Sequence, residues 1–165
     1  MTLLQIHIAL SFIGIVAGLA SMLAMIQGKM PPVLTAIALG SLVLTSATGF
    51  PLAPFGLDPP RIVGCVSLLL LAFAIAGLYL FHLAGAWRWV YIVTATAACW
   101  LNCFVGIAQT FMKVQFFHAL APTQQEPPFA IAQLALLALF IGFGWLGVKR
   151  LHVGPMLPAA LAEPR

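Results

Sequence analysis

The chain has 165 residues, of which 63% are hydrophobic and only 6% are charged, and its formal net charge is +4. A soluble globular domain carries about 25% charged residues, so the composition excludes that class. Runs of about 20 apolar residues cross a bilayer, and such runs make up most of this chain. We therefore expect one transmembrane domain over residues 1–165, with the lipid bilayer as its surroundings. No basic stretch outside the apolar runs predicts a nucleic-acid partner.

Five apolar segments follow one another along the chain, separated by turns rich in proline and glycine. We expect membrane spans at about residues 3–27, 33–50, 61–83, 87–113 and 129–148. The predicted fold is an all-α bundle of five transmembrane helices. The first segment has no basic region before it and no clear cleavage site after it, so we interpret it as a retained helix. Five spans place the two termini on opposite sides of the membrane.

The basic residues predict the orientation, because Lys and Arg gather on the cytoplasmic side of membrane proteins. Two basic residues, Arg61 and Lys113, fall on the side of the N-terminus. The other five fall on the opposite side: Lys29, Arg88, Lys149, Arg150 and Arg165. We therefore expect the N-terminus outside and the C-terminus in the cytoplasm.

One loop occurs twice, at residues 52–60 and 120–128, with the shared pattern L-A-P-x-x-x-[D/E]-P-P. One interpretation is a parallel repeat of a two-helix unit, spans two and three followed by spans four and five. The other is convergence on one favourable turn. An acid before two prolines is typical of a helix start, so Asp58 and Glu126 are predicted N-caps. Binding of a cation or a proton by these acids is the alternative.

A polar stripe runs along the fourth span. Asn102, Gln109 and Lys113 lie seven and four residues apart, which places them on one helix face. Such a stripe does not face lipid, because unpaired polar groups there are costly. It indicates either interhelical hydrogen bonds, which we favour for Asn102, or the wall of a polar cavity.

Other polar side chains are expected at the same depth, near the outer ends of their spans: Gln5, His7, Ser46, Thr48 and Gln133. We therefore predict an outward-facing polar pocket beneath the repeated loops. Gln109 and Lys113 would line it, assisted by His7, Asn102 and Gln133, and Lys113 would attract an anionic group. The leading hypothesis is a protein that binds or transports a small solute or ion.

Two other hypotheses belong to different classes. His7 and His118 fall on the same side of the membrane, and two imidazoles on facing helices ligate a b-type haem in membrane redox subunits. The sequence leaves the cofactor otherwise unknown. The third hypothesis is an accessory subunit without chemistry, in which the repeated loops contact a partner in a membrane complex. A homo-oligomer is expected under any of the three.

Small residues and cysteines predict packing. Gly14 and Gly18 form G-x-x-x-G in the first span, which indicates a close helix contact within the chain or between copies. Cys99 and Cys103 lie four apart, but buried cysteines usually behave as small hydrophobes, so we expect no metal site. The chain has no H-E-x-x-H, G-x-S-x-G or Walker signature. Their absence favours a protein that is not an enzyme.

Three segments carry a resemblance: residues 45–50 (TSATGF), residues 102–109 and the segment ending in Glu126-Pro127-Pro128-Phe129. Together they make the chain similar to a family of small bacterial polytopic inner-membrane proteins without assigned activity. The resemblance covers spans two to five. It implies a bacterial inner-membrane location and assigns no functional residue.

Overall fold

The computed structural model describes residues 2–52 and 59–151, and within these ranges it contains helices and no strand. The helices are α1 (Leu3–Met25), α2 (Pro32–Gly49), α3 (Pro59–Ile75), the π-helical η1 (Ala76–Leu80), α4 (Trp87–Lys113), α5 (Gln115–Leu120) and α6 (Pro127–Arg150). Five helical segments are long and apolar enough to cross a membrane: α1, α2, α3 with η1, α4 and α6. The predicted all-α bundle of five apolar helices is therefore confirmed.

Most helix ends lie within two residues of the predicted spans, and the structure departs further from the prediction in two places. The third segment changes to a π-helix at Ala76 and ends at Leu80, followed by His82 and Leu83 with φ of 46° and 58°. This left-handed backbone is a common way to end a helix, and it stops the segment before the predicted residue 83. The second difference is α5, a short helix between the fourth and fifth predicted spans.

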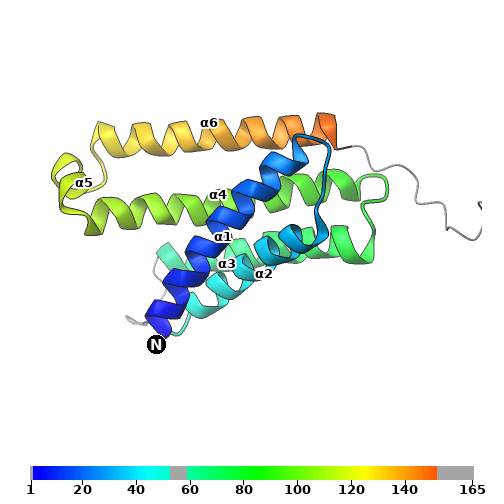
Figure 1. The fold of residues 1–165 in the computed structure, drawn as a ribbon. Helices are drawn as coiled ribbons and strands as arrows, with labels where there is room; N and C mark the ends of the chain where they lie inside the picture. The colour runs from blue at the N-terminus through cyan, green and yellow to red at the C-terminus, as the bar shows by residue number, and fades with distance from the viewer. Residues whose placement is uncertain (1, 53–58, 152–165) are drawn as a thin grey trace, which may run out of the picture.

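Neighbouring helices pack in chain order, as Figure 1 shows. α1 and α2 form a hairpin, α2 packs on α3, and α3 packs on α4. α1 crosses α4 obliquely and closes a ring of four helices, while α6 lies along α4 outside this ring. The proposed repeat would pair α2–α3 with α4–α6. Residues 53–58 of the first repeated loop lie outside the described residues, so the repeat stays a prediction.

The tight core lies in one half of the bundle, around the C-terminal half of α1 and the N-terminal half of α4. Every buried residue of α1 lies at position 14 or later: Gly14, Ala17, Gly18, Ser21, Met22 and Met25. Their partners include Leu71 on α3 and Ile92 and Cys99 on α4, each at most 1% exposed. The N-terminal half of α1 has no buried residue, so α1 packs tightly only through its C-terminal half.

Two glycines allow α1 to cross α4 closely. A Cβ atom on Gly18 would lie 2.5 Å from the Cys99 Sγ atom, and one on Gly14 would lie 3.3 Å from Asn102 Nδ2. A side chain at Gly18 would displace Cys99, and one at Gly14 would make a tight contact. The G-x-x-x-G contact therefore lies within the chain, which decides between the two alternatives. Cys99 and Cys103 are buried at this crossing, and no cluster of three metal-ligating side chains exists among the described residues.

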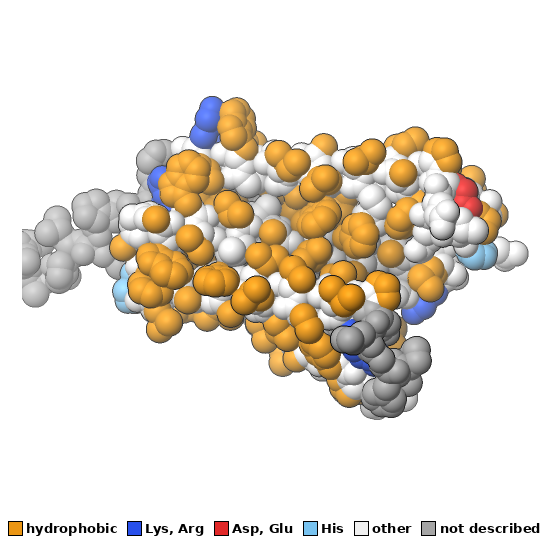
Figure 2. All heavy atoms as spheres, turned by 180° about the vertical axis from the view of Figure 1, so that it is seen from behind, with side chains coloured by type: hydrophobic (Ala, Val, Ile, Leu, Met, Phe, Trp, Pro, Cys, Tyr) orange, Lys and Arg blue, Asp and Glu red, His pale blue; other side chains and the backbone are white. Residues whose placement is uncertain are grey.

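The outer surface of the bundle is apolar. Hydrophobic side chains spread over the middle of the face in Figure 2, and the basic side chains lie toward its ends. α6 is the most exposed long helix, with Ile131, Leu134 and Ile141 each more than 60% exposed. Such an apolar surface is favourable in contact with lipid acyl chains and unfavourable in contact with water. The chain is therefore a multi-pass membrane protein.

Candidate functional site

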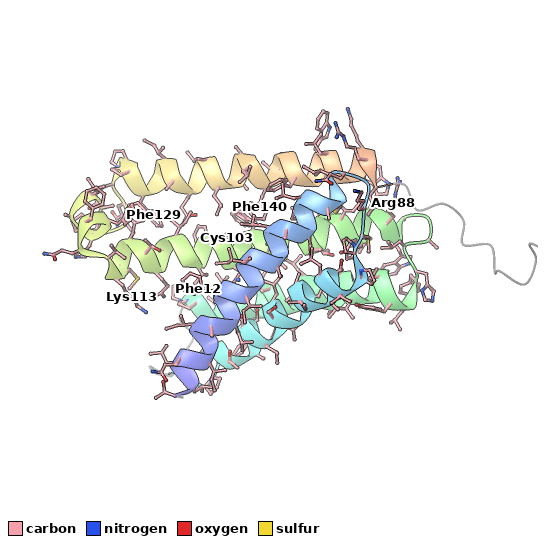
Figure 3. All side chains as sticks on the ribbon, viewed as in Figure 1. Phe12, Arg88, Cys103, Lys113, Phe129 and Phe140 are labelled. Atoms are coloured by element: carbon pink, nitrogen blue, oxygen red, sulfur yellow. The ribbon has the colours of Figure 1, made fainter. Side chains whose placement is uncertain are left out.

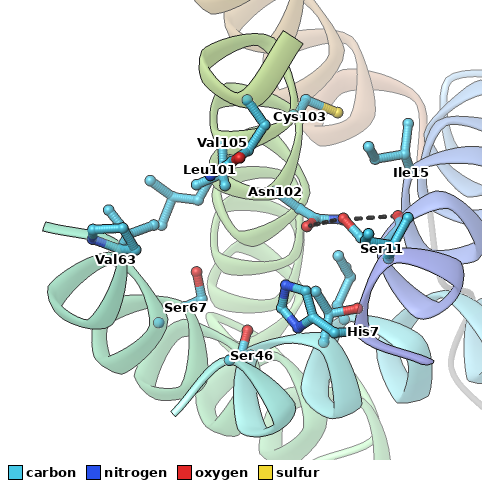
Figure 4. A pocket seen from close by; sticks show the side chains of 18 of the residues that line it. His7, Ser11, Ile15, Ser46, Val63, Ser67, Leu101, Asn102, Cys103 and Val105 are labelled. Atoms are coloured by element: carbon cyan, nitrogen blue, oxygen red, sulfur yellow. Dashed lines mark hydrogen bonds between the residues drawn. The ribbon is translucent and has the colours of Figure 1, made fainter. Parts of the chain in front are cut away.

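A cavity of about 840 Å³ lies between the N-terminal half of α1 and the adjoining parts of α2, α3 and α4. Figure 4 shows it from close by. It exists because the close contact of α1 with α4 lies at Gly14 and Gly18, and Ser11 is the last residue before them that bonds to α4. Its volume falls in the range of about 300–1,000 Å³ that is typical of ligand pockets.

Polar side chains from all four helices line this cavity. They are His7, Ser11, Thr45, Ser46, Arg61, Ser67, Asn102, Gln109, Thr110 and Lys113. Most other lining residues are apolar, among them Leu4, Ile8, Phe12 and Ile15 on α1. The site therefore offers hydroxyl, amide, imidazole and cationic groups in an otherwise apolar wall.

His7 joins α1 to α2 at the edge of the cavity. Its Nδ1 atom lies 3.1 Å from the Thr48 hydroxyl, which itself donates to the Leu44 carbonyl at 2.7 Å. Because the hydroxyl proton is used in that bond, the hydroxyl accepts from the imidazole, and the hydrogen-bond network assigns the neutral ring the Nδ1–H tautomer. Nε2 is then the ring atom that can accept a hydrogen bond from a ligand.

Asn102 bridges α4 and α1 through two reciprocal hydrogen bonds, drawn as dashed lines in Figure 4. The Ser11 hydroxyl donates to Asn102 Oδ1 at 3.1 Å, and Asn102 Nδ2 donates to the Ser11 carbonyl at 3.2 Å. Asn102 thus serves the helix contact and also forms part of the cavity wall. Its second amide proton remains a donor for a bound molecule.

Gln109 and Lys113 line the cavity near the end of α4. Figure 3 shows Lys113 leaving that end on the side of the bundle where α1 lies. Lys113 is exposed, and neither side chain makes a hydrogen bond or ion pair with another described residue. These two residues are therefore free to bind a ligand.

Sequence reasoning missed five polar residues of the cavity: Ser11, Thr45, Arg61, Ser67 and Thr110. Arg61 lies at the end where α2 and α3 meet, and its guanidinium donates to the Phe50 and Leu52 carbonyls at 3.3 and 2.6 Å. Thr45 and Ser67 are each 6% exposed, and the Thr45 Oγ1 atom has no hydrogen-bond partner. The only sequence signal for them is a polar side chain within or at the end of an apolar span.

Two predicted site residues lie elsewhere. Gln133 on α6 donates from Nε2 to the Phe104 carbonyl of α4 at 3.1 Å, and its Oε1 atom is buried without a partner. Gln133 does not line the cavity, because its amide is directed to the Phe104 carbonyl of α4. His118 is exposed on α5 and is also absent from the lining. The structure therefore does not bring His118 into the cavity with His7, and the haem hypothesis stays a prediction.

Glu126 occupies the N-cap position of α6, as expected, but its carboxylate makes no capping hydrogen bond to the helix. Pro127 and Pro128 have no N–H to donate, and the Phe129 N–H bonds to the Glu126 backbone carbonyl. The carboxylate instead accepts from the Thr123 hydroxyl at 2.8 Å and from the Gln125 N–H at 3.1 Å. The capping bond predicted for Glu126 is therefore replaced by a turn, and Asp58 lies outside the described residues.

The hydrogen bonds of this turn change the acidity of Glu126. Desolvation raises the pKa of its carboxyl, but the hydrogen bonds from Thr123 and Gln125 outweigh desolvation, so the pKa lies below the ordinary value of 4.5. Glu126 is thus a stable anion at neutral pH. Its bonding partners belong to the loop and not to the cavity.

No protein family, curated protein or solved structure matches this chain. The resemblance carried by residues 45–50, 102–109 and 126–129 therefore stays a prediction. The assignment of function depends on the cavity itself.

Proposed function

We propose that this protein is a bacterial inner-membrane protein that binds a small molecule with an anionic group in the cavity between α1 and α4. The main observation is that Lys113 and Gln109 line the cavity without a partner among the described residues. Binding is the common first step of the two activities that we predicted, solute binding and solute transport.

The charges of the wall favour an anion. Among the described residues that line the cavity, the charged side chains are Arg61 and Lys113, and both are cations. Their attraction for an anion is stronger beside an apolar wall than in open water, because the effective dielectric constant is lower there. The His7 imidazole, the hydroxyl groups and the Asn102 amide add neutral hydrogen-bonding groups.

The size of the cavity favours a molecule over an ion. A volume of about 840 Å³ corresponds to on the order of 30 water molecules. A single ion would contact only a small part of such a wall. We therefore narrow the predicted ligand from a solute or ion to an organic anion.

The distribution of basic residues supports an outward-facing mouth. Arg61 and Lys113 belong to the cavity end of the bundle. The other described basic residues belong to the opposite end, at or near the ends of helices: Lys29, Arg88, Lys149 and Arg150. Since the more basic side is usually cytoplasmic, the cavity end is expected to face the periplasm.

A thermal-stability screen in mild detergent tests the proposal. The purified protein is incubated with carboxylates, phosphate esters and sulfonates, each paired with a neutral analogue of the same shape. We expect an anionic member to raise the midpoint of unfolding, because a ligand at 100 times its Kd stabilises the folded state by about 2.7 kcal/mol. The neutral analogue should have a smaller effect.

Lys113→Ala should abolish most of this stabilisation while the folded yield is unchanged, because Lys113 is exposed and has no described bonding partner. Lys29→Ala is the matched control, since Lys29 is also exposed but lies at the opposite end. An equal ligand response in Lys113→Ala and the parent protein would contradict the proposed site.

A further inference from the structure

We infer that the ligand is an amphiphile with one acyl chain and an anionic head group, which enters from the bilayer through a lateral opening between α1 and α4. This inference rests on the proposed function and names the ligand class of the same cavity. It depends on where the cavity is open, on how far it extends and on how its polar groups are distributed.

The cavity is open through the apolar side of α1. Leu4, Ile8 and Phe12 line it, yet they are 47%, 41% and 66% exposed. All three lie in a span of 23 apolar-rich residues, so their surroundings in a membrane are acyl chains and not water. The opening therefore leads into the bilayer.

The crossing of α1 and α4 defines the inner limit of the opening. Gly14 and Gly18 allow the close contact with α4, and the Ser11–Asn102 hydrogen bonds lie one turn before Gly14. The residues of α1 before this point are partly or fully exposed, so the two helices are not packed together there. Leu136 of α6 also lines the cavity, which places the opening next to the lipid-exposed α6.

The depth of the cavity matches one leaflet. The α4 residues that line it run from Ala98 to Lys113, a distance of about 22 Å at 1.5 Å per residue. Half of a bilayer, with its head-group region included, is about 20–22 Å thick. The cavity is therefore deep enough for an acyl chain and its head group lying along the membrane normal.

Polarity decreases along this depth. Lys113, Thr110 and Gln109 lie at the end of α4, where lipid head groups are expected. The deepest lining residues are apolar: Leu19, Leu42, Leu71 and Ala98. An anionic head near Lys113 and a chain directed toward Leu71 would match this gradient. One chain fits better than a two-chain lipid, because about 840 Å³ lies within the range for one drug-sized molecule.

Photocrosslinking in vesicles tests the inference. The protein is reconstituted into phosphatidylcholine vesicles with a palmitic acid analogue that carries a diazirine in its chain, and the labelled peptides are identified by mass spectrometry after illumination. We expect adducts on the cavity-facing segments of α1 and α4. Excess oleate should reduce them, whereas oleyl alcohol, which lacks the negative charge, should reduce them much less.

A matched pair of variants tests the entry route. Ile8 and Ile6 lie on α1 with similar exposure, 41% and 39%, but only Ile8 lines the cavity. Ile8→Trp should fill part of the opening and reduce labelling by about fivefold, which corresponds to about 1 kcal/mol of lost binding free energy. Ile6→Trp should leave labelling unchanged.

The outcomes separate this inference from the proposed function. Labelling spread over all lipid-facing helices, without competition by oleate, would show that the cavity holds no acyl chain. If the soluble anions still stabilise the protein through Lys113 in that case, the proposed function stands and the inference is wrong. If neither oleate nor any soluble anion binds, both are wrong.

Discussion

At the scale of single residues, polar side chains inside the apolar helices have two kinds of surroundings. Some bond to a neighbouring helix, as Gln133 does to the Phe104 carbonyl and Thr96 to the Met22 sulfur atom. Others line the cavity, as Ser46 and Gln109 do. Both arrangements keep polar groups away from lipid, where an unpaired group is costly. Asn102 combines the two, which makes it the residue whose replacement is most informative.

We predict that Asn102→Ala destabilises the bundle about twice as much as Ser11→Ala. Ser11→Ala removes only the hydroxyl bond, whereas Asn102→Ala also removes the bond to the Ser11 carbonyl. Interhelical hydrogen bonds in membrane proteins contribute about 0.6 kcal/mol each. The free energy of unfolding is measured by sodium dodecyl sulfate titration in mixed micelles. It should fall by about 0.6 kcal/mol in Ser11→Ala and by roughly 1.2 kcal/mol in Asn102→Ala.

Thr94→Ala is the control for this series, because the Thr94 hydroxyl donates to the Val90 carbonyl within α4 itself. Its replacement breaks no hydrogen bond between helices, and we expect a change within about 0.5 kcal/mol. Equal effects of the Asn102 and Ser11 variants would show that the second hydrogen bond contributes nothing.

At the scale of elements, α1 is the helix that defines the site, because its two halves differ. Its C-terminal half packs through Gly14 and Gly18, while its N-terminal half forms a wall of the cavity. The glycine contact therefore controls the angle at which α1 leaves α4. A change at this contact should affect both the stability of the bundle and the shape of the cavity.

We predict that Gly18→Ala destabilises the protein by about 1–3 kcal/mol. The added Cβ would lie 2.5 Å from the Cys99 Sγ atom, and Cys99 is completely buried, so the sulfur has little room to move. Adding Cys99→Ala should restore much of the lost stability, because it removes the clashing atom. Thermal unfolding in detergent measures both variants.

Gly40→Ala on α2 is the control, since a Cβ there meets no atom within 4 Å. It should leave stability unchanged or raise it slightly, because alanine favours the helix over glycine. If Gly18→Ala behaves like Gly40→Ala, the crossing of α1 and α4 is looser than described.

At the scale of the whole molecule, five spans and the uneven distribution of basic residues predict a single orientation. We expect green fluorescent protein fused to the C-terminus to fluoresce in a bacterial host, because that end should be cytoplasmic. Alkaline phosphatase at the same position should be inactive, since it requires the periplasm. The reverse result would place the mouth of the cavity in the cytoplasm and contradict the proposed outward-facing site.

The amino-acid sequence by itself determined the five apolar helices and most of their ends. The thickness of a bilayer sets the length of each run, and prolines mark the starts of α2, α3 and α6. Spacing along one helix also placed Asn102, Gln109 and Lys113 on a common face, and all three line the cavity. These features depend on residues that are close in the chain.

Only the tertiary structure decided which faces meet. It directs Gln133 to α4, adds Arg61, Thr45 and Ser67 to the cavity, and leaves His118 outside it. It also shows that α1 packs tightly only through its C-terminal half. The physical reason is that helix packing depends on the shapes of side chains far apart in the sequence, such as Gly18 and Cys99. The periodicity of a single helix carries no information about its partner.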